Sequence, residues 1–168
     1  MTCETTEAEE QRYAELQLDA LDCARRGDRD DLLATMLRAG MPVNLSDHKG
    51  NTLLMLAAYH GNADTVALLL DKGADPDRPN ARAQTPLGGV AFKGYTAIAL
   101  RLLDAGADID ADQGAGMTPL MYARMFGRTE TALLLESRGA GRGPRLWRIA
   151  APISGAAINF FRAIRNHK

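Results

Sequence analysis

The sequence repeats itself at an interval of 33 residues, and this regularity constrains the fold more than any other feature of the chain. Three segments align without gaps, starting at His48, Ala81 and Gly114. The recurring positions are Thr52, Thr85 and Thr118; Leu54, Leu87 and Leu120; Gly61, Gly94 and Gly127; and Gly73, Gly106 and Gly139. A weaker copy precedes them, with glycines at Gly27 and Gly40. A unit this short cannot bury its own apolar face, so the copies are expected to stack.

Each unit is predicted to be a pair of helices. Thr85-Pro86 is typical of a helix start, because the hydroxyl accepts a backbone N–H and proline needs no donor in the first turn. The glycine nine residues later suits the left-handed residue that ends many helices. A second apolar run, such as residues 66–70, ends at another glycine and a polar Ala-Asp-x-Asp turn. The pattern therefore indicates an all-α chain.

Thr-Pro-Leu, Gly, Leu-Leu-Leu and Gly-Ala-Asp at this interval resemble the ankyrin repeat, and phrases such as LLMLAAYHGN and QTPLGGVAFKG are similar to small stand-alone bacterial ankyrin proteins. The resemblance implies an ankyrin-repeat solenoid of about four helix-turn-helix units over residues 16–141. The expected units lie near 16–47, 48–80, 81–113 and 114–141. An acidic N-terminal arm, residues 1–15, and a basic C-terminal helical tail, residues 142–168, would flank them. We expect the arm to be either a frayed, solvated helix or disordered.

Two positions depart from the family's pattern. The family's Thr-Pro-Leu-His signature ends here in Met55, Gly88 or Met121, so the hydrogen bond that the family's His makes with the Thr hydroxyl is expected to be missing. The loop glycine seen in the flanking units is Ala83 in the middle unit. If that site keeps a positive φ, Ala83 destabilises the loop by about 1 kcal/mol.

The last unit carries charges at positions that are apolar in the inner units. Arg124 stands where the inner units have alanine, and Glu136 stands where they have leucine. Terminal repeats need a polar outer face. The array is therefore expected to end with this unit.

Charge is distributed unevenly. All 21 acidic residues lie in residues 1–136, whereas residues 137–168 hold seven basic residues and no acidic one. Pro152 is expected to divide the tail and to open its second helix, which has an apolar face. Three interpretations stay open: a cap over the last repeat, contact with an anionic membrane or a partner groove, and nucleic-acid binding, which is the least expected. The candidate contact residues of the tail are Trp147, Phe160, Phe161, Arg162 and Arg165.

A cytoplasmic location, with possible membrane association through the tail, is expected. The N-terminus lacks the positive flank and apolar run of a signal peptide. The apolar stretch at residues 149–161 is well short of the roughly 20 residues that span a bilayer. Two cysteines, Cys3 and Cys23, form neither a disulfide framework nor a metal site.

No catalytic residue, cofactor or metal site is predicted. The histidines His48, His60 and His167 are not spaced as metal ligands. The glycine-rich residues 114–118 lack the Gly-Lys-Ser/Thr ending of a phosphate loop. The acidic pairs of the Ala-Asp-x-Asp turns recur with the repeat, which favours a structural role over calcium binding.

The resemblance implies that partners contact the turn tips and the outward positions of the first helix of each unit. The helix positions are predicted to align as a stripe along the concave face, and they are Tyr59, His60, Phe92, Lys93, Met125 and Phe126. The tip residues are His48, Lys49, Arg82, Gln84 and Met117. A row of aromatic residues in a chain with 5% aromatic content is typical of an interface. The alternative is that Phe92 and Phe126 pack between repeats.

We therefore expect a non-enzymatic protein-protein interaction module, a scaffold acting as an adaptor or regulator, and a monomer. The alternatives are a peripheral membrane adaptor anchored by the tail, and an inhibitor or immunity-type protein for an enzyme. The partner is a protein of unspecified identity, because a reusable scaffold carries its function in a grafted surface.

Overall fold

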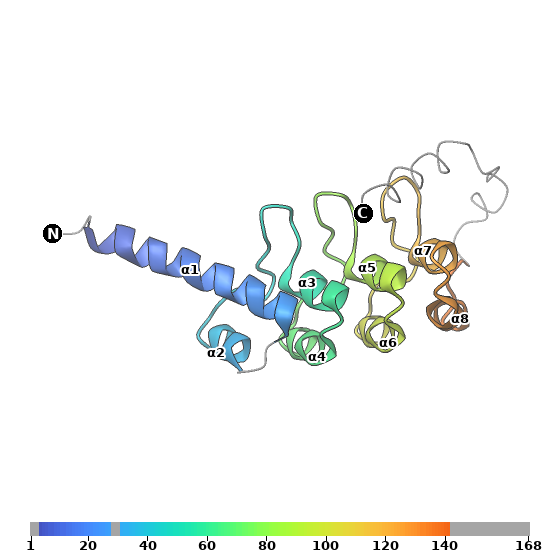
Figure 1. Cartoon of the computed structure of the whole chain (residues 1–168), viewed down its shortest axis with the longest axis horizontal. Helices are drawn as coiled ribbons and strands as arrows, with labels where there is room; N and C mark the ends of the chain where they lie inside the picture. The colour runs from blue at the N-terminus through green and yellow to red at the C-terminus, as the bar shows by residue number, and fades with distance from the viewer. Residues whose placement is uncertain (1–3, 28–30, 142–168) are drawn as a thin grey trace.

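The computed structural model describes residues 4–27 and 31–141 (Figure 1). This part of the chain contains eight helices and no β-strand. The helices are α1 (Glu4–Arg26), α2 (Leu32–Arg38), α3 (Leu53–His60), α4 (Ala63–Asp71), α5 (Pro86–Lys93), α6 (Thr96–Asp104), α7 (Pro119–Met125) and α8 (Thr129–Ser137). The predicted basic tail lies outside the described residues.

The helices form two rows of an elongated array (Figure 1). The first helices of successive units, α1, α3, α5 and α7, contact one another in order, and α4, α6 and α8 follow beneath them. Long loops between the units project beyond the first row. We call them finger 1 (residues 44–51), finger 2 (77–84) and finger 3 (110–117). The all-α solenoid expected from the repeat is confirmed.

Helix starts and ends follow the predicted chemistry. The threonine before each inner first helix accepts the N–H three residues later: Met55 to Thr52 at 3.1 Å, Gly88 to Thr85 at 3.4 Å, and Met121 to Thr118 at 3.3 Å. At the other end, Gly61 and Gly94 have φ of 83° and 86° and end α3 and α5. A side chain is strongly disfavoured in this left-handed region, so the repeated glycines have a backbone role.

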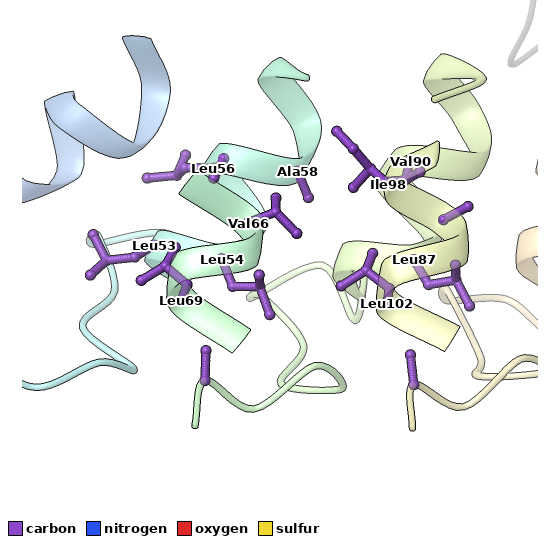
Figure 2. Close-up of a cluster of buried hydrophobic side chains, with 14 of the residues drawn as sticks. Leu53, Leu54, Leu56, Ala58, Val66, Leu69, Leu87, Val90, Ile98 and Leu102 are labelled. Atoms are coloured by element: carbon purple, nitrogen blue, oxygen red, sulfur yellow. The ribbon is translucent and has the colours of Figure 1, made fainter. Parts of the chain in front are cut away.

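The core runs through the array between the two rows (Figure 2). Leu54 of α3 and Leu87 of α5 are fully buried at equivalent positions, as are Leu69 of α4 and Leu102 of α6. Burial of each such leucine stabilises the fold by about 1.5–3 kcal/mol. The same residues recur every 33 positions because each unit offers its neighbour the same apolar surface.

The Ala-Asp-x-Asp turns link one unit to the next. A side chain in one turn accepts a backbone N–H from the following turn: Asp75 to Asn44 at 2.9 Å, Asp108 to Asp77 at 2.8 Å, and Gly141 to Asp110 at 2.9 Å. In the described part of the chain no three acidic, histidine or cysteine residues gather as a metal site. Asp77 and Asp110 thus join one unit to the next, whereas Asp75 and Asp108 accept N–H groups within their own turns, at 2.9 and 3.0 Å.

Asp77 carries a charge that its surroundings disfavour. Burial raises the pKa of Asp77 above its usual value, and the carboxylates of Asp108 and Asp75 raise it further, against the hydrogen bond from the Asp108 N–H, which lowers it. Because the folded-state pKa lies above the unfolded one, ionisation of Asp77 opposes folding. This opposition disappears as the pH falls below about 4, where the carboxyl is protonated in both states.

Asp77→Asn is accordingly expected to raise the free energy of unfolding at pH 7, by at most about 1 kcal/mol, because the amide keeps the acceptor and removes the charge. The gain should vanish below about pH 4. Urea unfolding at pH 7 and pH 3.5 measures both values. Asn44 occupies the equivalent position, so Asn44→Asp is the inverse control and should destabilise at pH 7. A gain that persists at low pH would contradict the assignment to charge.

Ala83 keeps the backbone of the glycine it replaces. Its φ is 60°, beside 76° at Gly50 and 74° at Gly116 in the equivalent positions. Ala83 therefore has the positive φ that strains an alanine backbone. Ala83→Gly is expected to stabilise the protein by about 1 kcal/mol at most, because the strain removed exceeds the entropy that glycine adds to the unfolded chain. Thermal unfolding of the variant measures this, and a lowered midpoint would show that finger 2 tolerates alanine without strain.

The last unit in the described part of the chain carries an ion pair at the two positions where the inner units have apolar residues. The guanidinium of Arg124 on α7 donates to Glu136 of α8 at 2.9 and 3.2 Å. The two side chains are 64% and 39% exposed. The charges that replace core residues therefore pair with each other at the surface.

The described part of the N-terminal arm, residues 4–15, is helical, which is one of the two states expected for it. α1 runs without a break from Glu4 to Arg26, through the predicted boundary between residues 15 and 16. Its C-terminal part contributes Ala20, Leu21 and Ala24 to the core. Its N-terminal part extends away from the array (Figure 1).

Candidate protein-binding face

Four aromatic side chains from three successive units form a continuous row. Tyr59 of α3 lies parallel to Phe92 of α5, with ring centroids 6.5 Å apart and an interplanar angle of 4°. Phe92 meets Phe126 edge to face at 4.4 Å and 74°. The ring centroid of Tyr122 of α7 lies 6.4 Å from that of Phe126. We call these four residues the aromatic row.

Local sequence explains how the row is assembled. A methyl group on Gly89 would lie 3.4 Å from Cδ2 of Tyr59, so the tyrosine packs directly over the glycine of the next unit. Lys93 places its ammonium 4.4 Å from the centre of the Tyr59 ring and 6.0 Å from that of Phe92. His60 touches Tyr59 edge to face at 5.6 Å. A cation over an aromatic face is a favourable pair, so Lys93 stabilises the aromatic row.

Members of the predicted stripe differ in exposure. Tyr59 and Met125 are 40% and 41% exposed. Phe92, Lys93 and Phe126 are half-buried. The row is thus partly an inter-repeat contact and partly an accessible surface.

The predicted contact residues at the finger tips also differ in exposure. His48 and Lys49 of finger 1 and Arg82 of finger 2 are exposed. Gln84 is half-buried, and its side-chain oxygen accepts from Asn80 at 3.2 Å. Met117 of finger 3 is half-buried too. The first two tips therefore offer basic groups to solvent, whereas Gln84 helps to hold its own loop.

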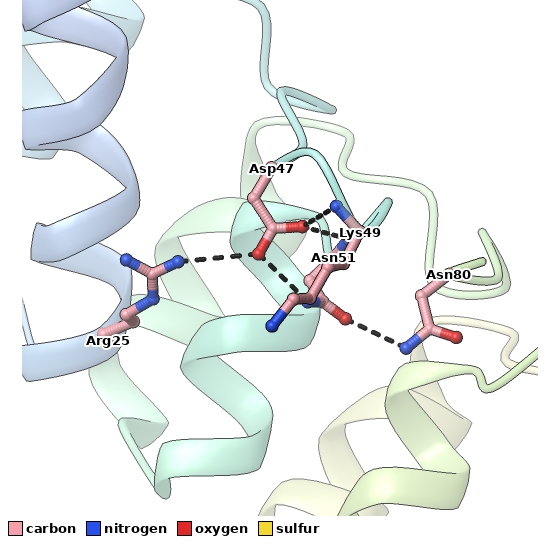
Figure 3. A network of polar contacts seen from close by, with 5 residues as sticks. All are labelled: Arg25, Asp47, Lys49, Asn51 and Asn80. Carbon is pink, nitrogen blue, oxygen red and sulfur yellow. Dashed lines mark hydrogen bonds and ion pairs between the residues drawn. The ribbon is translucent and has the colours of Figure 1, made fainter. Parts of the chain in front are cut away.

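Finger 1 is held in shape by one carboxylate (Figure 3). Asp47 accepts the N–H groups of Lys49 and Asn51, both at 2.9 Å, and the Asn51 side chain at 3.0 Å, with Arg25 of α1 at 3.5 Å. Burial raises the pKa of Asp47, but these hydrogen bonds outweigh burial and leave it below its usual value. Asn51 in turn accepts from Asn80 of finger 2 at 2.9 Å, so the two fingers are tied together.

The hydrogen bond from the family's histidine is missing at Thr85, where Gly88 stands in its place, but another side chain donates to the Thr85 hydroxyl. Gln113 reaches back from finger 3 and donates to the Thr85 hydroxyl at 2.9 Å, while its oxygen accepts the Thr85 N–H at 2.8 Å. It is 3% exposed. Its amide occupies the space beside Gly88, where any side chain would overlap it. A glutamine from the next unit thus replaces the missing histidine.

Gln113 can bond to Thr85 because Asp112, and not Gln113, accepts the loop N–H groups of finger 3. In fingers 1 and 2, Asp47 and Asn80 at the equivalent position accept the loop N–H groups. In finger 3, Asp112 accepts the N–H of Gly114 at 2.9 Å and that of Gly116 at 3.1 Å. The 33-residue spacing of Asp47, Asn80 and Gln113 marks the position of Gln113 in finger 3, but it does not indicate the hydrogen bonds to Thr85 in the unit before.

A further residue class missed from the sequence follows the capping glycines. Asn62 donates to the carbonyls of Ala24 and Arg25 at 2.9 and 3.0 Å, and so completes the end of α1. Arg128, 66 residues later, donates from Nε to the carbonyl of Phe92 at 3.0 Å at the end of α5. Carbonyls at a helix end lack intrahelical partners, so the second and the fourth unit each cap the first helix of the unit before them. Tyr122 of the aromatic row was also missed. The equivalent residue in the preceding unit, 33 positions earlier, is Gly89.

A family model of ankyrin repeats in three copies matches residues 20–113. The chain belongs to the ankyrin-repeat family. The match covers the first three units, and α7 and α8 repeat the same architecture beyond it. The hydrogen-bonded fingers and the paired helices are therefore features of an ankyrin array.

Three similar proteins share parts of the ankyrin array. An ankyrin repeat protein of Pseudomonas aeruginosa is 55% identical over 47 residues, 28% of this chain and 27% of its own length. The human ankyrin repeat and SAM domain-containing protein 4B is 50% identical over 36 residues, 21% of this chain and 9% of its own. Human oxysterol-binding protein-related protein 1 is 41% identical over 78 residues, 46% of this chain and 8% of its own. The chain thus spans about a quarter or less of these relatives.

The candidate tail contacts Trp147, Phe160, Phe161, Arg162 and Arg165 lie outside the described residues. Among the helices that are described, none has the length and apolar character needed to cross a membrane.

Proposed function

We propose that the ankyrin array binds a protein partner through the aromatic row, together with Met125 and the basic tips of fingers 1 and 2, and acts as an adaptor or regulator without catalysis of its own. Ankyrin repeats are generally protein-protein interaction modules, and the bacterial relative is itself an ankyrin repeat protein. The observation that supports this face is the row itself: partly exposed rings from three units, with a cation held against them.

The physical properties of this face suit an interface. Aromatic side chains bury much surface for little loss of conformational freedom, and they dominate binding energy when a partner excludes water. The fingers are held by side-chain to backbone hydrogen bonds, as at Asp47 and Asn80. A surface that is already ordered loses less entropy on binding than a mobile one.

The test compares two exposed positions on the face with one away from it. A partner captured by cross-linking to the full-length chain is purified and its Kd measured by calorimetry. Tyr59→Ala with Met125→Ala is expected to weaken binding at least about 30-fold, the effect of losing about 2 kcal/mol of hot-spot contact. Leu133→Ala is the control, because Leu133 is 60% exposed on α8 in the second row. Equal affinities for the wild type and the double variant would refute the proposal.

A further inference from the structure

α1 presents an apolar stripe that nothing in the described chain covers. Ala20 and Ala24 are fully buried against the array. Leu16 and Tyr13 continue this stripe toward the N-terminus at helical spacing, because residues three or four apart share a face. They are 40% and 47% exposed. The helix therefore extends its packing face beyond the units that it packs against.

Acidic residues surround this stripe. Residues 4–22 hold seven acidic residues and one basic residue. Glu9 and Glu10, one turn before Tyr13, are exposed. A partner for the stripe must therefore combine apolar and basic side chains.

The chain's own tail has that composition. Residues 142–168 hold six basic residues and no acidic one, together with Trp147, Phe160 and Phe161. We propose that residues 152–168 dock on the Tyr13–Leu16 stripe of α1 in the same molecule, with Arg162 and Arg165 facing its glutamates. The docked tail would extend the ankyrin array at its N-terminal end.

The tail is long enough to reach. Three helix-to-helix contacts separate α7 from α1. At the usual 8–10 Å between the axes of packed helices, the distance from α7 to α1 is at most about 30 Å. Residues 142–151 span about 33–36 Å when extended. The following 17 residues would cover about 25 Å as a helix, which matches the length of α1 from Glu7 to Leu21. Tethering at this range gives a millimolar effective concentration, so the molecule's own tail outcompetes that of a second copy.

The outer face of the last unit is a poorer match. A hollow of about 250 Å³ there is lined by Arg124 and Arg128, with Leu133 and Glu136 beside them. Glu136 is already paired with Arg124. A basic segment meets like charge on this face and opposite charge on α1. Electrostatics therefore favour α1 over a cap on the last repeat, which is one of the three interpretations left open by the sequence.

Hydrogen exchange of the full-length chain, followed by mass spectrometry, tests the docking. Arg162→Glu with Arg165→Glu should make the amides of residues 7–19 exchange at least about 10-fold faster, because the uncovered helix frays. Arg142→Glu with Arg145→Glu, the same charge change in the linker, should leave them unchanged. Tyr13→Ala with Leu16→Ala should likewise release the tail, whereas Leu18→Ala, on the opposite side of α1, should not.

A charge swap makes the test independent of local helix stability. Glu9→Lys with Glu10→Lys should speed exchange, and adding the two arginine reversals should restore protection. Unchanged exchange in both charge-reversed variants would overturn the proposal. Protection that grows with protein concentration would assign the stripe to a second copy and also overturn it. Wild-type α1 that exchanges as fast as the variants, in a chain that sediments with phosphatidylserine vesicles, would assign the tail to membranes.

Discussion

Gly88→Ala is expected to lower the free energy of unfolding by about 2–4 kcal/mol, although alanine is the better helix former. The added methyl group would overlap the side-chain amide of Gln113. Expelling that amide breaks its hydrogen bonds to the N–H and hydroxyl of Thr85, at 2.8 and 2.9 Å, and to the carbonyl of Ala111 at 3.0 Å. Thr85 is buried, so its N–H would lose its partner away from water.

The neighbouring glycine provides the matched control. Gly89→Ala makes the same chemical change in the same helix, but its methyl group would meet only Tyr59, at an ordinary 3.4 Å. It should be neutral or stabilising by up to about 1 kcal/mol, the difference in helix propensity. Urea unfolding of both variants measures the contrast. Equal effects of the two substitutions would show that Gln113 does not depend on the space at Gly88.

A double-mutant cycle measures the coupling energy between Gly88 and Gln113. Gln113→Ala alone removes the same three hydrogen bonds, so Gly88→Ala should add little to it. A coupling energy of about 1–3 kcal/mol is expected, because both variants break one interaction. Additive effects would mean that Gly88 and Gln113 stabilise the array separately.

The sequence predicts the parts of the fold that each unit repeats. Thr85, Gly94 and Leu87 are the same residues in all three clear copies because every unit needs a helix start, a helix end and a core contact. Gln113 could not be deduced in this way. It differs from its counterparts Asp47 and Asn80, and its partner lies 28 residues earlier in the preceding unit. Only the packing of units shows which side chain fills a space that glycine leaves.

The alignment of the predicted stripe could be deduced from the sequence, but the burial of its members could not. Spacing of 33 residues places Tyr59, Phe92 and Met125 at equivalent positions. Their exposure depends on neighbours that vary between units, such as Gly89 beneath Tyr59 and Phe126 beside Phe92. The two interpretations left open by the sequence therefore apply to different members of the stripe.

Phe92→Ala is expected to destabilise the protein by about 2–3 kcal/mol, near the lower limit for phenylalanine truncation because the ring is only half-buried. The substitution removes both ring contacts, at 6.5 Å to Tyr59 and 4.4 Å to Phe126, and the support beneath Lys93. Tyr59→Ala, at an exposed site, should lower stability by only about 1 kcal/mol.

Thermal and urea unfolding of these two variants, alongside the partner affinity of each, separate packing from binding. Phe92→Leu is the third variant, because it keeps most of the apolar volume and loses the ring contacts with Tyr59 and Phe126, each of which is worth about 0.5–1.5 kcal/mol at most. The expected order of stability is wild type, Phe92→Leu, then Phe92→Ala. Tyr59→Ala should bind the partner weakly while unfolding near the wild-type midpoint. If Tyr59→Ala instead unfolds as readily as Phe92→Ala, the whole row is an inter-repeat contact and the partner must dock elsewhere on the array.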